Sequence, residues 1–194
     1  AGVEALAALG AVDFLMWVVT GISTGLTQGF SIQLSQYYGA KDFENLRKSL
    51  AHSYRLTAFI AAGVLILSQS FASLVLTGLH TPSNIIGMSL LYLRIIFCGI
   101  PATAAYNMFA SALRAMGNSK TPLTAMIIAS VLNVSLDILF VAGFGWGVAG
   151  AAIATVIAQS FSAVYCFLIL RRIDIVHLTR ADFMPASGMN ARLM

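Results

Sequence analysis

Residues 124–147, TAMIIASVLNVSLDILFVAGFGWG, form an apolar run in which Asp137 is the one charged residue. A helix needs roughly 20 mainly apolar residues to cross the hydrocarbon of a bilayer, so this run is long enough to span a membrane. An ionisable side chain inside such a span is costly and points to a function. Asn133 precedes Asp137 by four residues and lies on the same helical face. The pair therefore predicts a place inside a membrane protein where a small cation or a proton binds.

The composition supports a membrane setting. The chain has 194 residues, of which 59% are hydrophobic and 9% are charged, against roughly 25% charged residues in soluble domains. The mean hydropathy is +0.87. The net charge of +4 does not indicate a nucleic acid partner, because the basic residues form no continuous stripe and cluster between apolar runs. We therefore expect an integral membrane protein whose surroundings are the lipid bilayer.

The apolar runs predict an all-α polytopic membrane protein. Five long apolar segments lie near residues 10–37, 53–78, 85–113, 121–143 and 148–170, which indicates a bundle of about five transmembrane helices. Pro101 falls inside the third segment, where it removes a backbone donor, so we expect a bend there.

The charges of the connections predict the orientation. The connections GAKDFENLRKS (39–49) and RAMGNSKTP (114–122) and the tail 171–194 carry basic residues, whereas TGLHTPSNIIG (77–87) and AGFGWGVAG (142–150) contain no Lys or Arg. Basic loops face the cytoplasm in membrane proteins. The pattern predicts a multi-pass protein of the cell membrane, plasma or inner, with the basic connections and the tail on the cytoplasmic side.

The fifth segment supplies further oxygen atoms. Thr155 lies four residues after Ala151, so its hydroxyl has two alternatives. It can donate to the Ala151 carbonyl of its own helix, as threonines in membrane helices commonly do. If it turned toward Asp137 instead, the Ala151 carbonyl would be exposed beside it, and the resulting cluster of oxygens would suit a hard cation.

The sequence gives no indication of an enzyme or of a cofactor. It contains no HExxH or GxSxG motif, and its three histidines, His52, His80 and His177, lie at segment ends. The cysteines, Cys98 and Cys166, fall in apolar segments without metal-binding spacing, which predicts that both are core residues.

Five motifs in order resemble the multidrug and toxic compound extrusion (MATE) transporters. They are GLTQGFSIQLSQYYGAKD (25–42), YLRIIFCGIP (92–101), ALRAMGNSKTPL (112–123), NVSLD (133–137) and GVAGAAIAT (147–155). The resemblance implies a fold of twelve transmembrane helices in two six-helix lobes, of which this chain corresponds to helices two to six of the N-terminal lobe. Residues 1–194 are then a single partial membrane domain, and 171–194 form a cytoplasmic linker between the lobes.

The resemblance also implies a function. MATE transporters export organic, often cationic, compounds in exchange for Na⁺ or H⁺, so the implied partners are a small organic substrate and a coupling ion, with no cofactor. The implied mechanism is alternating access, with the charge on Asp137 as the switch. The family's cation site maps onto Asp137, Asn133, Thr155 and Ala151, with Na⁺ expected at the first three, and a supporting polar network maps onto Tyr92 and Asn107.

Other expectations follow from the chain's extent. It starts at Ala1 and its polar tail ends without a closing element, so both ends look cut, and the family's helix one, with its aspartate, and the C-terminal lobe are predicted to be missing partners. We expect no transport by the chain alone. Three alternatives stay open: a lipid-linked oligosaccharide flippase of the same superfamily, a membrane-embedded enzyme, and a truncated or split helical module that does not transport.

Overall fold

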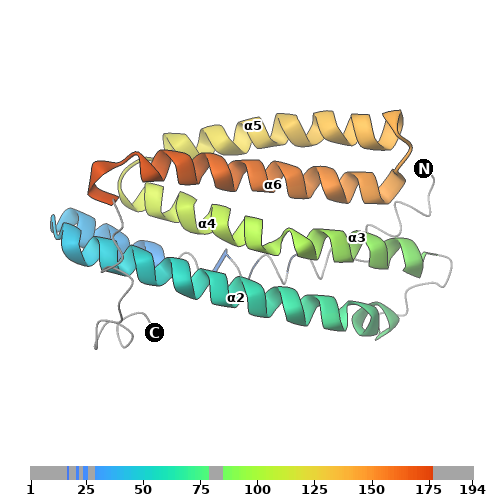
Figure 1. Ribbon diagram of the computed structural model, residues 1–194, viewed down its shortest axis with the longest axis horizontal. Helices are drawn as coiled ribbons and strands as arrows, with labels where there is room; N and C mark the ends of the chain where they lie inside the picture. Colours follow the sequence, from blue (N-terminus) through green and yellow to red (C-terminus); the bar gives the residue numbers. More distant parts are fainter. Residues whose placement is uncertain (1–16, 18–20, 22–23, 26–28, 79–84, 177–194) are drawn as a thin grey trace.

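The computed structural model describes residues 17, 21, 24–25, 29–78 and 85–176. Over these residues it consists of helices and connecting turns, without strands, which confirms the all-α prediction (Figure 1). After a helical stretch at 29–39, the elements are α2 (Phe43–Gly78), α3 (Ile86–Cys98), α4 (Ile100–Ala115), α5 (Lys120–Asp137), the π-helix η1 (Ile138–Gly143), α6 (Gly147–Arg171) and the 3₁₀ turn η2 (Asp174–Val176).

Three of the described helical segments are long and apolar enough to cross a membrane: α2, α5 continued by η1, and α6. The pair α3 and α4 makes a fourth span if the two helices are counted as one. These elements cover the segments predicted near 53–78, 85–113, 121–143 and 148–170. The segment predicted near 10–37 lies mostly outside the described residues.

The connection before α2 is much shorter than the predicted 39–49. The turn occupies only residues 40–42, because two nested hydrogen bonds end the preceding helix. The outer bond runs from Asp42 N–H to Tyr37 O at 3.0 Å, and the inner bond runs from Lys41 N–H to Tyr38 O at 3.1 Å. Lys41 adopts the left-handed conformation, φ 58°, that this helix ending requires. The sequence predicted that FENLRKS (43–49) belongs to the connection. In the structure these residues form the first turns of α2.

Asp42 is the residue that starts α2. Its carboxylate accepts hydrogen bonds from the Asn45 side chain at 2.6 Å and from the Asn45 backbone N–H at 3.2 Å. These two bonds, the side-chain bond first, lower the pKa of the Asp42 carboxyl. The capping residue is therefore charged at neutral pH, which suits the positive end of the helix dipole.

The predicted bend in the third segment lies at Gly99, two residues before Pro101. Helices α3 and α4 are inclined by 41° at this break. Gly99 N–H donates to Ile96 O at 2.8 Å, the tighter i−3 pattern that ends a helix. From α2, the Gln69 side-chain amide donates to the Arg94 carbonyl of α3 at 2.8 Å. A neighbouring helix therefore satisfies a backbone acceptor close to the break, as is required in hydrocarbon.

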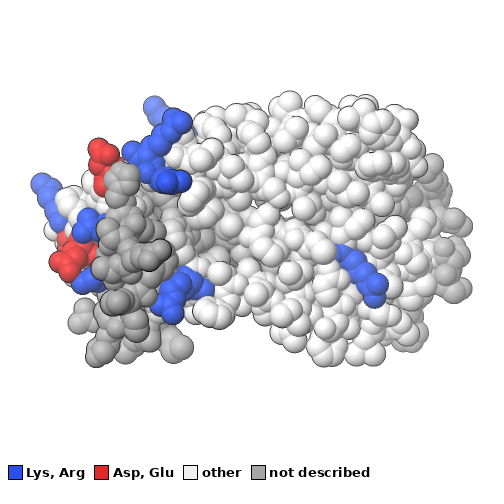
Figure 2. All heavy atoms as spheres, in the orientation of Figure 1, with Lys and Arg blue, Asp and Glu red and all other residues white. Residues whose placement is uncertain are grey.

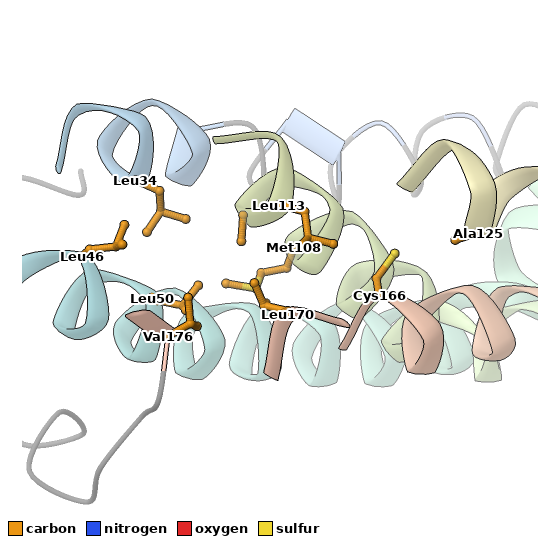
Figure 3. Packing of buried hydrophobic residues seen from close by; sticks show 10 residues of the cluster. Leu34, Leu46, Leu50, Met108, Leu113, Ala125, Cys166, Leu170 and Val176 are labelled. Atoms are coloured by element: carbon orange, nitrogen blue, oxygen red, sulfur yellow. The ribbon is translucent and has the colours of Figure 1, made fainter. Parts of the chain in front are cut away.

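Helix α4 lies at the centre of the bundle and contacts α2 on one side and α6 on the other (Figure 1). Helices α5 and α6 run side by side. The larger apolar core joins these elements near the ends of α4 and α6 and the start of α2 (Figure 3). Its fully buried members include Leu50, Met108, Leu113, Cys166 and Leu170. The prediction that both cysteines are core residues is thus confirmed for Cys166 and wrong for Cys98, which is exposed on α3. The second core cluster holds the opposite half of α2 against α3.

Charged side chains gather at one end of the molecule, where α2 begins and α6 ends (Figure 2). The rest of the visible face is almost entirely uncharged, and many large apolar side chains on the outer helices are more than half exposed, among them Phe59, Ile66 and Val131. Such an exposed apolar surface is expected of a protein surrounded by lipid. The gathered basic residues are those that the sequence assigns to the cytoplasmic side.

Substitution of Gly99 tests the close packing at the bend. A Cβ atom at residue 99 would lie 2.8 Å from Val156 Cγ2 of α6 and 3.0 Å from the Ile96 carbonyl oxygen. We expect Gly99→Ala to reduce the free energy of unfolding by about 1–3 kcal/mol, the usual cost of overpacking. Thermal unfolding of the purified chain in detergent measures this. The control is Gly63→Ala, because a Cβ atom there meets nothing within 4 Å; equal melting temperatures for the two variants would contradict the packing role of Gly99.

Candidate functional site

The candidate cation site lies between α5 and α6, within the membrane-spanning part of the bundle. Asn133 and Asp137 occupy the last turns of α5, and Ala151 and Thr155 occupy the first turns of α6. All four residues are half-buried. The tight connection between the helices lets α6 fold back along α5, and it uses glycines with positive φ angles at 145 (69°) and 147 (54°).

A chain of hydrogen bonds joins three of the predicted site residues. The Asn133 side-chain amide donates to Thr155 Oγ1 at 3.3 Å, and the Thr155 hydroxyl donates to the Ala151 carbonyl at 3.0 Å. The structure therefore adopts the first of the two alternatives for Thr155, a bond within its own helix. It also brings Thr155 and Asn133 together across the helix pair, as the resemblance implied.

Asp137 is the exceptional member of the group. Its Oδ1 atom is enclosed by protein and has no hydrogen-bond partner among the described residues. Unsatisfied polar atoms are rare in folded proteins, and each one calls for an explanation. The carboxylate follows Asn133 by one helical turn, so it shares a face with the residue that begins the hydrogen-bonded chain.

A π-helix begins directly after Asp137. The Phe144 N–H donates to the Leu139 carbonyl at 2.9 Å, the wider i−5 pattern of a π-helix. Short π segments often occur at functional sites in membrane and soluble proteins. The sequence did not predict this element, and nothing in the residues 138–143 distinguishes it from an ordinary α-helical continuation.

Glycine packing holds α6 against this π-helix. A Cβ atom at Gly150 would lie 2.9 Å from the Phe140 Cβ atom and 3.2 Å from the Phe140 carbonyl carbon. Because Gly150 has no side chain, the backbone of α6 approaches the backbone of the π-helix closely. The contact joins the residue before Ala151 to the third residue after Asp137.

The supporting residues Tyr92 and Asn107 lie farther along the bundle. Tyr92 is on α3 and packs at the edge of the second core cluster. Asn107 is half-buried on α4. Its depth in the third segment predicts a hydrogen-bonding partner, for which Asp137 is one candidate, and over the described residues Asp137 Oδ1 has no such partner. The participation of Tyr92 and Asn107 in a polar network stays a prediction.

No group of three or more His, Cys, Asp or Glu side chains converges anywhere in the described part of the chain. The candidate site instead offers one carboxylate together with amide, hydroxyl and carbonyl oxygens. These are the ligand types that hard cations prefer.

Comparisons with known proteins agree with this architecture. The family described as MatE matches residues 1–139. Two Bacillus subtilis proteins, the probable multidrug resistance proteins YoeA and YpnP, are each 32% identical to this chain over 87% and 84% of its length, which is 36% and 37% of theirs. A crystal structure of a MATE protein in the bent conformation superposes with a TM-score of 0.93 at 25% identity, covering 99% of this chain and 43% of that one.

The chain therefore belongs to the MatE family, the multidrug and toxic compound extrusion transporters, and is a multi-pass protein of the cell membrane. It spans a little over a third of the length of the two Bacillus proteins that it matches.

Removal of the Thr155 hydroxyl tests the hydrogen-bonded chain. We expect Thr155→Val to reduce the free energy of unfolding by about 0.5–1.5 kcal/mol, because the bonds from Asn133 and to Ala151 are both lost. Thr155→Ser keeps both bonds and should melt close to the wild type in detergent. Ser160→Ala is the matched control, since that hydroxyl bonds only within its own helix, to Val156 O at 2.7 Å. If Thr155→Val were no less stable than Ser160→Ala, the bond between α5 and α6 would contribute nothing.

Proposed function

We propose that this chain is part of a secondary active antiporter that exports small organic, often cationic, compounds in exchange for Na⁺ or H⁺. Membership of the MatE family supports transport rather than catalysis. The printed names of the two Bacillus relatives, probable multidrug resistance proteins, support drugs or toxins as the exported compounds. No cofactor is required in this proposal, because the ion gradient supplies the driving force.

The observation that carries the proposal is the enclosed Asp137 Oδ1 atom, which has no hydrogen-bond partner among the described residues. A carboxylate oxygen enclosed within a membrane span favours a proton, an ion pair or a bound cation, because an isolated charge there is unfavourable. No Lys or Arg occurs in residues 121–170, which include all of α5 but its first residue, Lys120, and all of α6 but its last, Arg171. A mobile cation or a proton is therefore the natural partner of Asp137.

The residues beside Asp137 can complete a site for Na⁺. Asn133 points its amide nitrogen at Thr155, so its own carbonyl oxygen is available to a ligand. The Thr155 oxygen donates one hydrogen and accepts one, and it retains a second lone pair. Ala151 differs, because its carbonyl already accepts the Thr155 hydroxyl. Binding of a cation to all four residues thus requires the Thr155 hydroxyl to rotate.

Competition at this carboxylate gives a means of coupling. A proton on Asp137 removes the negative charge that attracts Na⁺, so the two ions exclude each other at the site. A bound ion shifts a conformational equilibrium only if it binds one conformation more tightly than another. Rotation of Thr155 and movement of the tightly packed junction at Gly150 are changes through which occupancy of Asp137 acts on the position of α6.

In this proposal the export path requires parts of the transporter other than this chain. The chain covers 36% and 37% of the two Bacillus relatives and 43% of the MATE structure in the bent conformation. We propose that a substrate cleft forms against a second lobe and a further first helix, and that the described helices contribute the ion site. Efflux of a cationic dye from vesicles that contain this chain alone would contradict the need for those partners.

Replacement of Asp137 tests the ion site. We expect the protein to bind Na⁺ in detergent, measured by isothermal titration calorimetry at several pH values, with affinity that falls as protons compete. Asp137→Asn should lose Na⁺ binding by at least about tenfold, because an amide supplies no charge. Glu44→Gln is the control, since it removes a carboxylate from the exposed end of α2 that pairs with Lys48.

The outcomes of this titration distinguish the coupling ions. Sodium binding that depends on Asp137 supports Na⁺ coupling, and proton uptake that disappears in Asp137→Asn without sodium binding supports H⁺ coupling. If Na⁺ binding and proton uptake are both the same in Asp137→Asn as in Glu44→Gln, Asp137 has no role in coupling.

A further inference from the structure

A groove of about 370 Å³ lies on the bundle away from the candidate ion site. Side chains of α2 and α4 make up most of its lining, and Phe167 of α6 completes it. Small side chains make the space: Ala58, Ala61 and Ala62 on α2 and Ala105 on α4. Asn107 does not line the groove and lies on a different face of α4 from Ala105 and Met108. The groove is therefore separate from the residues assigned to ion binding.

Three aromatic rings close one end of this groove. Tyr54 and Phe109 meet edge to face with centroids 5.5 Å apart, and Phe109 and Phe167 lie 5.3 Å apart. They come from α2, α4 and α6 respectively, and all three line the groove. On α2 the groove extends from Tyr54 to Leu65, a distance of roughly 16 Å at the rise of an α-helix. That length is close to half the hydrocarbon thickness of a bilayer, or one leaflet.

The aromatic end is also the end at which basic residues gather. Arg55 precedes Ala58 by three residues and Ala62 by seven, so it lies on the edge of the groove face of α2. Arg171 follows Phe167 by four residues on α6. Both arginines are exposed, and Figure 2 shows the basic side chains concentrated at this end of the molecule. Arg55 is level with Tyr54, and Arg171 lies about one turn beyond Phe167, so α2 and α6 each carry an arginine close to the aromatic rings.

Two of the lining side chains, Tyr54 and Thr57, carry a hydroxyl group. Thr57, on α2 one turn from Tyr54, is 9% exposed, and its hydroxyl oxygen is enclosed without a partner among the described residues. Within the described part of the chain, the Thr57 hydroxyl is therefore an unpaired hydrogen-bond donor beside a mainly apolar lining. An acyl chain needs only apolar walls, but the ester group at its head can accept such a hydrogen bond.

We propose that this groove binds one molecule of an anionic phospholipid from the cytoplasmic leaflet. One acyl chain lies on α4 between α2 and α6, its ester oxygens lie near Thr57 and the aromatic rings, and its phosphate lies between Arg55 and Arg171. Guanidinium groups bind phosphate through two parallel hydrogen bonds, which favours an anionic headgroup over a zwitterionic one. The lipid would fasten α2 and α6 to the same side of α4.

Native mass spectrometry of the delipidated chain in detergent tests this proposal. The chain is titrated with phosphatidylglycerol and, separately, with phosphatidylcholine that carries the same acyl chains. We expect one phosphatidylglycerol to bind preferentially. The double variant Arg55→Gln and Arg171→Gln should lose that preference, by about fivefold for each arginine removed. Its control is the double variant Lys41→Gln and Lys120→Gln, which removes two charges from the same end of the molecule away from the groove.

A second pair of variants tests the groove itself. Ala58→Trp fills it and should reduce binding of both lipids severalfold, whereas Ile66→Trp adds the same side chain to a lipid-facing position of α2 outside the groove and should not. Thermal unfolding in detergent checks that each variant is folded. Equal lipid binding by the two tryptophan variants would overturn the assignment of the groove. An unchanged preference for phosphatidylglycerol in the double arginine variant would overturn the assignment of the headgroup.

Discussion

Polar groups inside hydrocarbon must find their partners within the protein, and the rest of this structure depends on that constraint. Helices satisfy the backbone, and several hydroxyl side chains bond within their own helices: Ser53, Ser135 and Ser160 each donate to the carbonyl one turn earlier. Among the described residues, two enclosed side-chain atoms have no partner, Thr57 Oγ1 and Asp137 Oδ1. One lies on the wall of the lipid groove and the other at the ion site, so each marks a place where a ligand can complete the polar network.

Close helix packing is the second requirement of the site. Without an aqueous hydrophobic effect between helices, small residues let backbones approach and gain contact energy. Gly99 places the bend of α3 and α4 against Val156, next to Thr155, and Gly150 places α6 against the π-helix that follows Asp137. Close contacts at Gly99 and Gly150 therefore fix the helices that carry the proposed ion ligands. Thr155 is itself part of α6, so it moves whenever α6 moves.

The sequence predicted much of the helical architecture because apolar runs of membrane length have few alternatives. The runs at 121–143 and 148–170 agree closely with α5 plus η1 and with α6. The start of α2 was placed too late, because a charged, amphipathic helix end has the same composition as a loop. Pro101 indicated the bend, but Gly99 is where the helix breaks, since a proline is tolerated in the first turn of the following helix.

The site was predictable only in part. Spacing alone placed Asn133 and Asp137 on one face and Ala151 and Thr155 on another, and the structure brings Asn133 and Thr155 into hydrogen-bond contact. The direction of the Thr155 hydroxyl, the π-helix and the groove across α2, α4 and α6 depend on contacts between distant segments, which no single run of residues encodes. Binding of a cation by these residues stays a prediction.

The most direct test of the account is infrared difference spectroscopy of the purified protein, in which the carboxyl bands are followed as Na⁺ is added and as the pH is changed. The account predicts a carboxyl band that responds to one or both ions and disappears in Asp137→Asn. A band that is absent from the wild type, or that persists unchanged in Asp137→Asn, would contradict the claim that this carboxylate exchanges Na⁺ or protons.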